Sequence, residues 1–344
     1  MKNRFMLAPM TNSQSHEDGT LSDDEFHWLT LRAKGGFGLT MTCASHVQKV
    51  GQGFVGQLGI FDDIHIDGHR RLAAAIQSEG SLAVAQLHHA GLRSPEELIG
   101  EKPVCPSNDE ETGARALSLE EVGELRDDFI RAAVRAKKAG YDGVEIHGAH
   151  GYILTQFISE QYNHRDDAYG GSFANRVRII FEIAQGIRQQ CGDTFLLGVR
   201  LSPERFGLKL KEILKLAQQV IDSTLFDFLD ISLWDSFKAP HEEEQKHRSL
   251  LEHVASLDMK DVKLTVAGKI GSSKQVQQIL DAGVDFVSIG RAAILHYDYP
   301  MRVMADSEFE PISNPVSANY LKEQGLAPAF IKYMRRWKGF VSEE

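Results

Sequence analysis

The sequence predicts a (β/α)8 barrel, an α/β fold in which eight parallel strands alternate with helices and close into a ring. Eight short runs along the 344 residues are apolar almost throughout, as parallel strands covered on both faces are. Helical stretches separate these runs. Three of the runs also begin alike, with an aspartate and then a strand-like segment: DGVEI at Asp142, DFLDI at Asp227 and DFVSI at Asp285. An open doubly wound sheet is the alternative architecture.

The predicted strands have the lengths of ordinary strands, and their spacing is too uneven for a solenoid of fixed repeat. In chain order they are RFMLAP at 4–9, LTMTCA at 39–44, LAVAQL at 82–87, DGVEI at 142–146, FLLGVRL at 195–201, DFLDI at 227–231, KLTVAG at 263–268 and DFVSI at 285–289.

Serine N-caps mark several helix starts between the strands. A serine followed three residues later by Glu or Gln can form a reciprocal capping box with the backbone. This pattern occurs at Ser22 with Glu25, Ser118 with Glu121, and Ser272 with Gln275. After Val122, apolar or small residues recur every three or four positions, which predicts a helix with one core-facing stripe: Leu125, Phe129, Ala133 and Ala136.

No change in composition marks a second domain, so residues 1–344 are expected to form a single barrel domain. The polar segment at about 92–116, with three prolines, is expected to be a long loop after the third strand, over the barrel mouth. Loops of that length are often functional lids. Residues from about 326 to 344 are expected to form a C-terminal tail.

Composition narrows the functional classes. The formal net charge of −10 argues against nucleic acid or an anionic membrane as a partner. The three cysteines include no C-x-x-C pair, so no zinc knuckle or iron–sulfur cluster is expected, and their sparse use fits a reducing compartment. The sequence has no apolar run of about 18 residues and no signal peptide. We therefore expect a cytoplasmic protein that acts on a small-molecule substrate.

In a barrel of this kind, the working residues lie at the carboxyl ends of the strands. Almost every predicted strand end carries a polar or special residue, as expected of a catalytic barrel: Pro9-Met10-Thr11, Ala44-Ser45, Gln86 to His89, His147 to Tyr152, Arg200, Ser232 and Trp234, Gly268-Lys269, and Gly290-Arg291.

The last two strand ends predict a phosphate site. Gly268 with Lys269 and Gly290 with Arg291 each combine a small-residue turn with a cation. The loops after strands seven and eight are the usual phosphate site of this fold. In the alternative interpretation, these glycines merely turn the chain and the cations are solvated.

Two polar residues lie inside otherwise apolar strands. The Arg200 guanidinium, in LGVRLS, needs an anionic or strongly accepting partner. That partner is either a barrel carboxylate such as Glu145 or a ligand that becomes anionic during turnover. The Gln86 amide can both donate and accept. Together with a phosphate site, these two residues suit a large planar heterocycle with a phosphate tail.

EIHGAHGY at 145–152 places two imidazoles and a phenol at one strand end. His147 and His150 could be satisfied structural histidines, or metal ligands that lack a clear third partner. They could also be neutral donors to one substrate oxygen, with Tyr152 near enough to deliver a proton. The flanking glycines favour the third interpretation, because they let a ligand approach the backbone closely.

Several motifs together point to a known family. They are NRFMLAPMT at 3–11, AQLHHAG at 85–91, GYDGVEIHGAHGYILTQF at 140–157, NHRDDAYGGSFANR at 163–176, VRLS at 199–202 and SIGRA at 288–292. On these motifs, and over nearly its whole length, the chain resembles the old yellow enzymes, FMN-dependent ene-reductases with a (β/α)8 barrel. The combination is most similar to the bacterial NADH-dependent flavin oxidoreductases of that family.

The resemblance implies FMN as cofactor, NAD(P)H as reductant and a role for each matching residue. Flavin would be bound by Ala8, Pro9, Met10, Thr11, Ala44, Gln86 and Arg200, and its phosphate by Gly268, Lys269, Gly290 and Arg291. His147 and His150 would bind the carbonyl oxygen of an α,β-unsaturated substrate, and Tyr152 would protonate its α carbon after hydride reaches the β carbon. No G-x-G-x-x-G follows a strand, so NAD(P)H is expected to react in the same pocket.

The chain departs from the family pattern in places. The first predicted strand begins at about Arg4, whereas relatives usually carry a further N-terminal segment, and Ser13 stands where bacterial relatives often have tyrosine. The ending YMRRWKGF resembles a tail that inserts an arginine into a neighbouring subunit's site. Arg335 or Arg336 could do so in a homodimer or larger homo-oligomer, or could belong to a solvated basic helix end.

Other functions stay open at this point. The same flavin chemistry could serve a nitro compound, a quinone or dioxygen as acceptor. A metal-dependent barrel hydrolase could use His147, His150 and one further ligand. A protein that binds FMN without turnover is a fourth alternative, which the retained His147, His150 and Tyr152 argue against.

Overall fold

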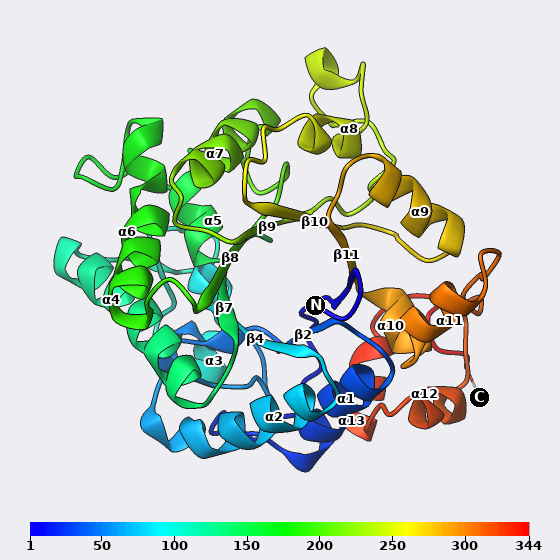
Figure 1. Cartoon of the computed structure of the whole chain (residues 1–344). Coiled ribbons are helices and arrows are strands. Elements are labelled where there is room, and N and C mark those ends of the chain that lie inside the picture. The colour runs from blue at the N-terminus through cyan, green and yellow to red at the C-terminus, as the bar shows by residue number, and fades with distance from the viewer. Residues whose placement is uncertain (344) are drawn as a thin grey trace.

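The computed structural model describes residues 1–343 and confirms the predicted (β/α)8 barrel, with eight parallel strands in a closed ring and helices around it (Figure 1). Pairing runs around the ring from strand to strand, and β2 with β4 completes it. The barrel strands are β1 (Phe5–Leu7), β2 (Leu39–Met41), β4 (Leu82–His88), β7 (Gly143–Gly148), β8 (Leu196–Leu201), β9 (Phe228–Ser232), β10 (Lys263–Ala267) and β11 (Phe286–Ile289). The short β3 (Ser45–His46) extends the pairing at the end of β4.

Helices on the outside of the ring connect successive strands (Figure 1). The connecting helices are α1 (Asp23–Lys34), α2 (Ile66–Ser78), α4 (Leu119–Lys138), α6 (Phe173–Cys191), α7 (Leu210–Asp222), α8 (Leu250–Ala255) and α9 (Ser273–Asp281). After β11 come α10 (Arg291–Leu295), α11 (Tyr299–Ala305), α12 (Ala318–Glu323) and α13 (Pro328–Met334). Among residues 1–343, no helix combines the length and the apolar character needed to cross a bilayer.

Two of the three predicted capping boxes form completely, at Ser118 and Ser272. The prediction of the third capping box, at Ser22, is wrong for one of its two hydrogen bonds. Ser22 does accept a hydrogen bond from the backbone N–H of Glu25, but the Glu25 side chain turns inward and accepts from Asn12 and Ser15. A buried carboxylate is stabilised more by side-chain donors than by a position at an exposed helix end.

The segment 92–116 has more structure than a loop. It includes α3 (Glu96–Ile99) and two short strands, β5 (Val104–Cys105) and β6 (Arg115–Ala116), which form a small parallel sheet. Farther on, the predicted stripe of α4 is buried, and α6 packs beside α4. Gly186 permits that close approach, because a Cβ there would lie 2.2 Å from Ile130 Cδ1.

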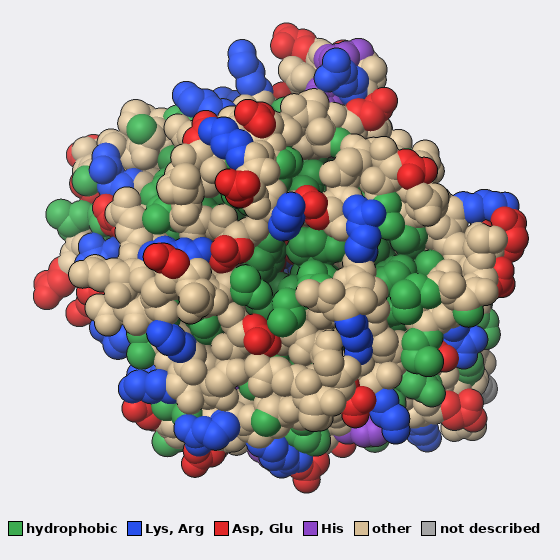
Figure 2. Space-filling model, viewed as in Figure 1, with side chains coloured by type: hydrophobic (Ala, Val, Ile, Leu, Met, Phe, Trp, Pro, Cys, Tyr) green, Lys and Arg blue, Asp and Glu red, His purple; other side chains and the backbone are tan. Residues whose placement is uncertain are grey.

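Side chains inside the ring form an apolar layer and a polar layer. Met6, Leu39, Phe228 and Phe286 belong to a small inner cluster, separate from the larger core between strands and helices. Hydrophobic side chains also gather over the middle of the face shown in Figure 2. Because side chains alternate along a strand, Asp230 lies on the same inner face as Phe228, one layer nearer the carboxyl end. This polar layer positions the candidate site.

Candidate active site

Four buried polar side chains form the centre of the polar layer. Gln86, Glu145, Arg200 and Asp230 are each no more than 4% exposed. Strand register pairs Gln86 with Glu145 and Arg200 with Asp230. The Gln86 amide Nε2 donates to Glu145 Oε1 at 2.7 Å, and Arg200 Nε lies 3.1 Å from Asp230 Oδ2. The layer therefore holds two carboxyl groups and one guanidinium.

The partner of Arg200 is a barrel carboxylate, as one of the two sequence-based alternatives has it, but the carboxylate is Asp230 and not Glu145. Parallel register places Asp230 directly beside Arg200 on β9, whereas the opposite neighbour in register on β7 is His147. The contact with Asp230 is an ion contact and not an aligned hydrogen bond. Within residues 1–343 the guanidinium donates no hydrogen bond, so its N–H groups are available to a ligand.

Charge in this layer is balanced by protonation. Burial, followed by the neighbouring charge of Asp230, holds the pKa of Glu145 well above its usual value. Burial also raises the pKa of Asp230, to about 6, and Arg200 opposes that rise. One guanidinium neutralises one carboxylate, so we assign the proton to Glu145 and the negative charge to Asp230 at neutral pH.

The turn after β7 brings His147, His150 and Tyr152 together, as the sequence predicts. His150 and Gly151 have φ values of 63° and 74°, so the chain turns sharply before α5 (Ile153–Ile158) begins. A Cβ on Gly151 would lie 2.6 Å from Phe206, which explains the glycine. The His147 ring centroid lies 5.1 Å from the ring centroids of both His150 and Tyr152.

Both imidazoles are neutral at neutral pH. Burial, then nearby cations and other histidines, lowers the pKa of His147 well below its usual value; burial, then Arg200 and Arg93, does the same for His150. Nδ1 of His147 accepts from the Ala149 backbone N–H at 3.2 Å, so the ring proton is on Nε2. His150 Nε2 lies 2.8 Å from Ser232 Oγ.

Tyr152 has a free phenol at the same place. Its hydroxyl makes no hydrogen bond within residues 1–343, and its ring lies half-buried among the histidines. Burial raises the pKa of the phenol, an effect that Arg93 partly opposes. The group therefore keeps its proton at neutral pH and can act as an acid.

Sequence reasoning missed three supporting residues. Gln57 Nε2 lies 2.6 Å from the Ala44 carbonyl and 3.0 Å from His88 Nδ1, and the His88 ring centroid lies 4.3 Å from that of Tyr152. The second missed residue is Arg93, whose Cζ lies 4.7 Å from the Tyr152 ring centroid, and the third is Asp230, the partner of Arg200. A carboxylate inside the apolar run DFLDI was a usable signal, of the same kind as Arg200 and Gln86.

The predicted ring-binding residues lie at the strand ends where FMN is expected. Pro9, Met10 and Thr11 follow β1 and are half-buried, as is Ala44 after β2, and Ala8 is buried. Gln86 uses its amide N–H on Glu145, which leaves Oε1 as an acceptor. The Gln86 acceptor and the Arg200 N–H groups that make no hydrogen bond lie beside half-buried apolar residues. This combination fits a flat polar heterocycle.

The predicted phosphate residues also lie at adjacent strand ends, but only one of the two cations is free. Gly268 and Lys269 follow β10, and Gly290 is the N-cap of α10, which starts at Arg291. Lys269 Nζ lies 2.9 Å from Asp235 Oδ2, whereas Arg291 is exposed and has no carboxylate partner within residues 1–343. The site therefore fits an anion with Arg291 as its free cation.

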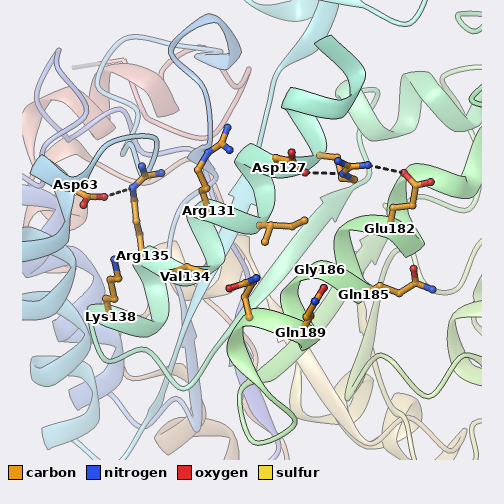
Figure 3. A pocket seen from close by; sticks show the side chains of 13 residues that line it. Asp63, Asp127, Arg131, Val134, Arg135, Lys138, Glu182, Gln185, Gly186 and Gln189 are labelled. Carbon is orange, nitrogen blue, oxygen red and sulfur yellow. Dashed lines mark hydrogen bonds and ion pairs between the residues drawn. The ribbon is translucent and has the colours of Figure 1, made fainter. Parts of the chain in front are cut away.

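A hollow of about 800 Å³ lies away from the barrel mouth, between α4 and α6 (Figure 3). Its charged residues are largely neutralised by each other: Arg126 lies 2.8 Å from Asp127, and Arg135 lies 2.7 Å from Asp63. No His, Cys, Ser, Thr or Tyr side chain in the described part of the chain lines this hollow. Across residues 1–343, no three His, Cys, Asp or Glu side chains are grouped as a metal site requires, so the ligand set of a metal-dependent hydrolase is not formed.

Comparison with known proteins identifies the family. Residues 1–310 match the family described as NADH:flavin oxidoreductase / NADH oxidase. The chain is 35% identical over 319 residues to the probable NADH-dependent flavin oxidoreductase YqiG of Bacillus subtilis, covering 90% of this chain and 85% of that protein. It is 30% identical to an NADPH dehydrogenase of Bacillus cytotoxicus, covering 90% of each.

The fold is equally similar to a solved structure. The old yellow enzyme homologue from Zymomonas mobilis superposes with a TM-score of 0.79 at 27% identity, over 96% of this chain and 94% of that one. Sequence and fold thus lead to the same family. The chain belongs to the NADH:flavin oxidoreductase / NADH oxidase family, and it is an FMN-binding, NAD(P)H-dependent oxidoreductase of the old yellow enzyme type.

Proposed function

We propose that this oxidoreductase reduces the activated C=C bond of an α,β-unsaturated carbonyl compound. One observation carries the proposal: at the barrel mouth the neutral His147 imidazole lies 5.1 Å, centroid to centroid, from both the neutral His150 imidazole and the protonated Tyr152 phenol. Two neutral donors suit a carbonyl oxygen that gains negative charge, and a phenol suits protonation of the adjacent carbon.

Each side chain has a distinct task. His147 offers its Nε2–H to the substrate oxygen, because Nδ1 is already held by the Ala149 backbone. Ser232 can donate to His150 Nε2, which would leave the His150 proton on Nδ1 for the same oxygen. Preorganised donors of this kind contribute about 3–4 kcal/mol each to transition-state stabilisation in other enzymes. Tyr152 then gives its proton to the α carbon.

When bound, FMN would supply the redox chemistry, namely transfer of hydride from NAD(P)H to the β carbon of the acceptor. In our proposal Pro9, Met10, Thr11 and Ala44 would line the ring, the Gln86 amide oxygen would accept a hydrogen bond from it, and the Arg200 guanidinium would supply positive charge and donors to it. Gly268, Gly290 and Arg291 hold the phosphate. Lys269 contributes charge from its pair with Asp235.

A second candidate keeps the same site and changes the acceptor. The description of the family includes NADH oxidases, which makes dioxygen the leading alternative acceptor. A nitro compound or a quinone would use the same geometry, because each receives hydride at the same place.

The experiment is an absorbance titration of the purified holoprotein. Anaerobic NADH or NADPH should bleach the flavin bands, and cyclohexenone should restore them under the same anaerobic conditions. The His147→Ala, His150→Ala double variant should be bleached normally and recover slowly. Recovery with quinone or air but not with any enone would reject the C=C substrate and retain the flavin oxidoreductase.

A further inference from the structure

Several non-glycine residues in the loops at the carboxyl ends of the strands have left-handed backbone, and three of them are in contact. His150, Arg205 and Trp234 have φ values of 63°, 71° and 61°, and they lie in the loops after β7, β8 and β9. Such conformations are unfavourable for residues other than glycine and cluster at functional sites. Their side chains are in contact: the His150 and Trp234 rings meet edge to face with centroids 5.9 Å apart, and Arg205 Cζ lies 4.3 Å from the Trp234 ring centroid.

A second arginine contacts the same cluster through other residues. Arg93 Cζ lies 4.7 Å from the Tyr152 ring centroid, and Arg93 donates a hydrogen bond of 2.6 Å to the His150 carbonyl oxygen. The Arg93 charge also acts on the reacting groups. Burial has the largest effect: it lowers the pKa of His147 and His150 and raises the pKa of Tyr152. The positive charge of Arg93 lowers all three pKa values by a smaller amount. The proposed catalytic cluster is therefore contacted by Arg93, at Tyr152 and His150, and is adjoined by Arg205 through Trp234.

Neither guanidinium is neutralised. Within residues 1–343, no carboxylate lies within 4.0 Å of Arg93 or Arg205, although many other arginines of this chain are paired. Nearby carboxylates are already engaged: Glu204 contacts Lys238, and Asp235 contacts Lys269. A chain of net charge −10 thus keeps two unpaired cations at the mouth of one site. A local field of this sign attracts anions and retains them.

We propose that Arg93 and Arg205 form an anion subsite, and that the hydride acceptor of this enzyme carries a carboxylate in addition to its reacting carbonyl group. The inference rests on the proposed function and specifies its substrate class. Trp234, which is 41% exposed, provides a flat apolar face beside Arg205 for the body of the acceptor. The guanidinium groups then bind the carboxylate while His147 and His150 bind the carbonyl oxygen.

The test compares an acid with its neutral ester in the holoenzyme. The acceptors are 3-acetylacrylate and its methyl ester, and kcat/KM is measured for each with NADH. We expect the acid to be preferred by about tenfold to a hundredfold, as a charge-assisted contact would give. Arg205→Gln should remove most of that preference by lowering kcat/KM for the acid alone. Arg70→Gln, on the exposed outer face of α2, is the matched control and should change neither value.

A binding measurement separates the subsite from turnover. Oxidised holoenzyme is titrated with 4-hydroxybenzoate and with its methyl ester, and flavin absorbance reports each Kd. Arg205→Gln should weaken the acid by about tenfold and leave the ester unchanged. Arg93 also hydrogen-bonds the His150 carbonyl, so replacing it with a neutral residue could disturb the loop. We therefore use Arg93→Lys, which keeps the positive charge and should preserve part of the preference for the acid.

The outcomes are distinct. Equal or better use of the ester by the wild type would overturn the subsite and leave the proposed ene-reductase intact. Failure of both acceptors after normal bleaching by NADH would instead reject the proposed function. Slower bleaching by NADH in Arg205→Gln, with an unchanged ratio of acid to ester, would assign the cations to the dinucleotide pyrophosphate and overturn the proposal.

Discussion

Two isosteric substitutions in the polar layer of the barrel, Asp230→Asn and Glu145→Gln, should have contrasting effects on the stability of the protein: one large and one small. Asp230→Asn removes the negative charge that faces Arg200. Glu145→Gln replaces a carboxyl group that we assign as already neutral. We expect the first to destabilise the apoprotein strongly and the second to be nearly silent, although both change a fully buried acid to its amide.

The magnitudes follow from burial and contact geometry. The Arg200 side chain is 5% exposed and Asp230 is 0% exposed, with 3.1 Å between Nε and Oδ2. Removing one partner of such a pair costs about 3–5 kcal/mol, because the other charge stays buried without compensation. Glu145→Gln keeps an acceptor for the Gln86 amide and should cost less than about 1 kcal/mol.

Thermal unfolding followed by circular dichroism, at mildly alkaline pH, measures both effects. At roughly 2 °C per kcal/mol for a chain of this size, Asp230→Asn should lower Tm by about 6–10 °C and Glu145→Gln by less than about 2 °C. Asp67→Asn is the control, because its partner Arg70 and Asp67 itself are 54% and 91% exposed. A larger loss in Glu145→Gln than in Asp230→Asn would place the proton on Asp230 and refute the assignment.

The remaining expectations concern catalysis and pH. Tyr152→Phe should slow the oxidative half-reaction and leave reduction by NAD(P)H intact in stopped-flow absorbance; equal loss in both halves would reject Tyr152 as the proton donor. The His147→Ala, His150→Ala variant should weaken phenol binding by about a hundredfold in spectral titrations, since two donors to the oxyanion are lost, and unchanged Kd values would remove these residues from the substrate site. Burial lowers the pKa of His69 to about 4. A group with a lowered pKa contributes stability above its unfolded value of about 6.5 and loses it as pH falls toward 4, so acid melting curves should show a loss of about 3 kcal/mol that His69→Gln lacks. An identical pH slope in the two proteins would show that His69 titrates normally.

The strands and their order could be predicted from the sequence because each is a continuous apolar run, and burial on both faces of a parallel sheet requires that. The helix starts were nearly as clear, since capping boxes depend on residues only three positions apart. Ser22 shows the limit of such local rules. Its box is incomplete because Glu25 is drawn to Asn12 and Ser15, which the fold places next to it.

The sequence by itself also determined the family, the cofactor and the gathering of His147, His150 and Tyr152, which are close along the chain and share one turn. Only the tertiary structure decided the ionic partners. Asp230 lies 30 residues beyond Arg200, and Asp235 lies 34 residues before Lys269. Their pairing depends on strand register and on loops meeting at the barrel mouth. Alternation along one strand gives the face of a side chain, but its neighbour on the next strand is set by how the whole ring closes.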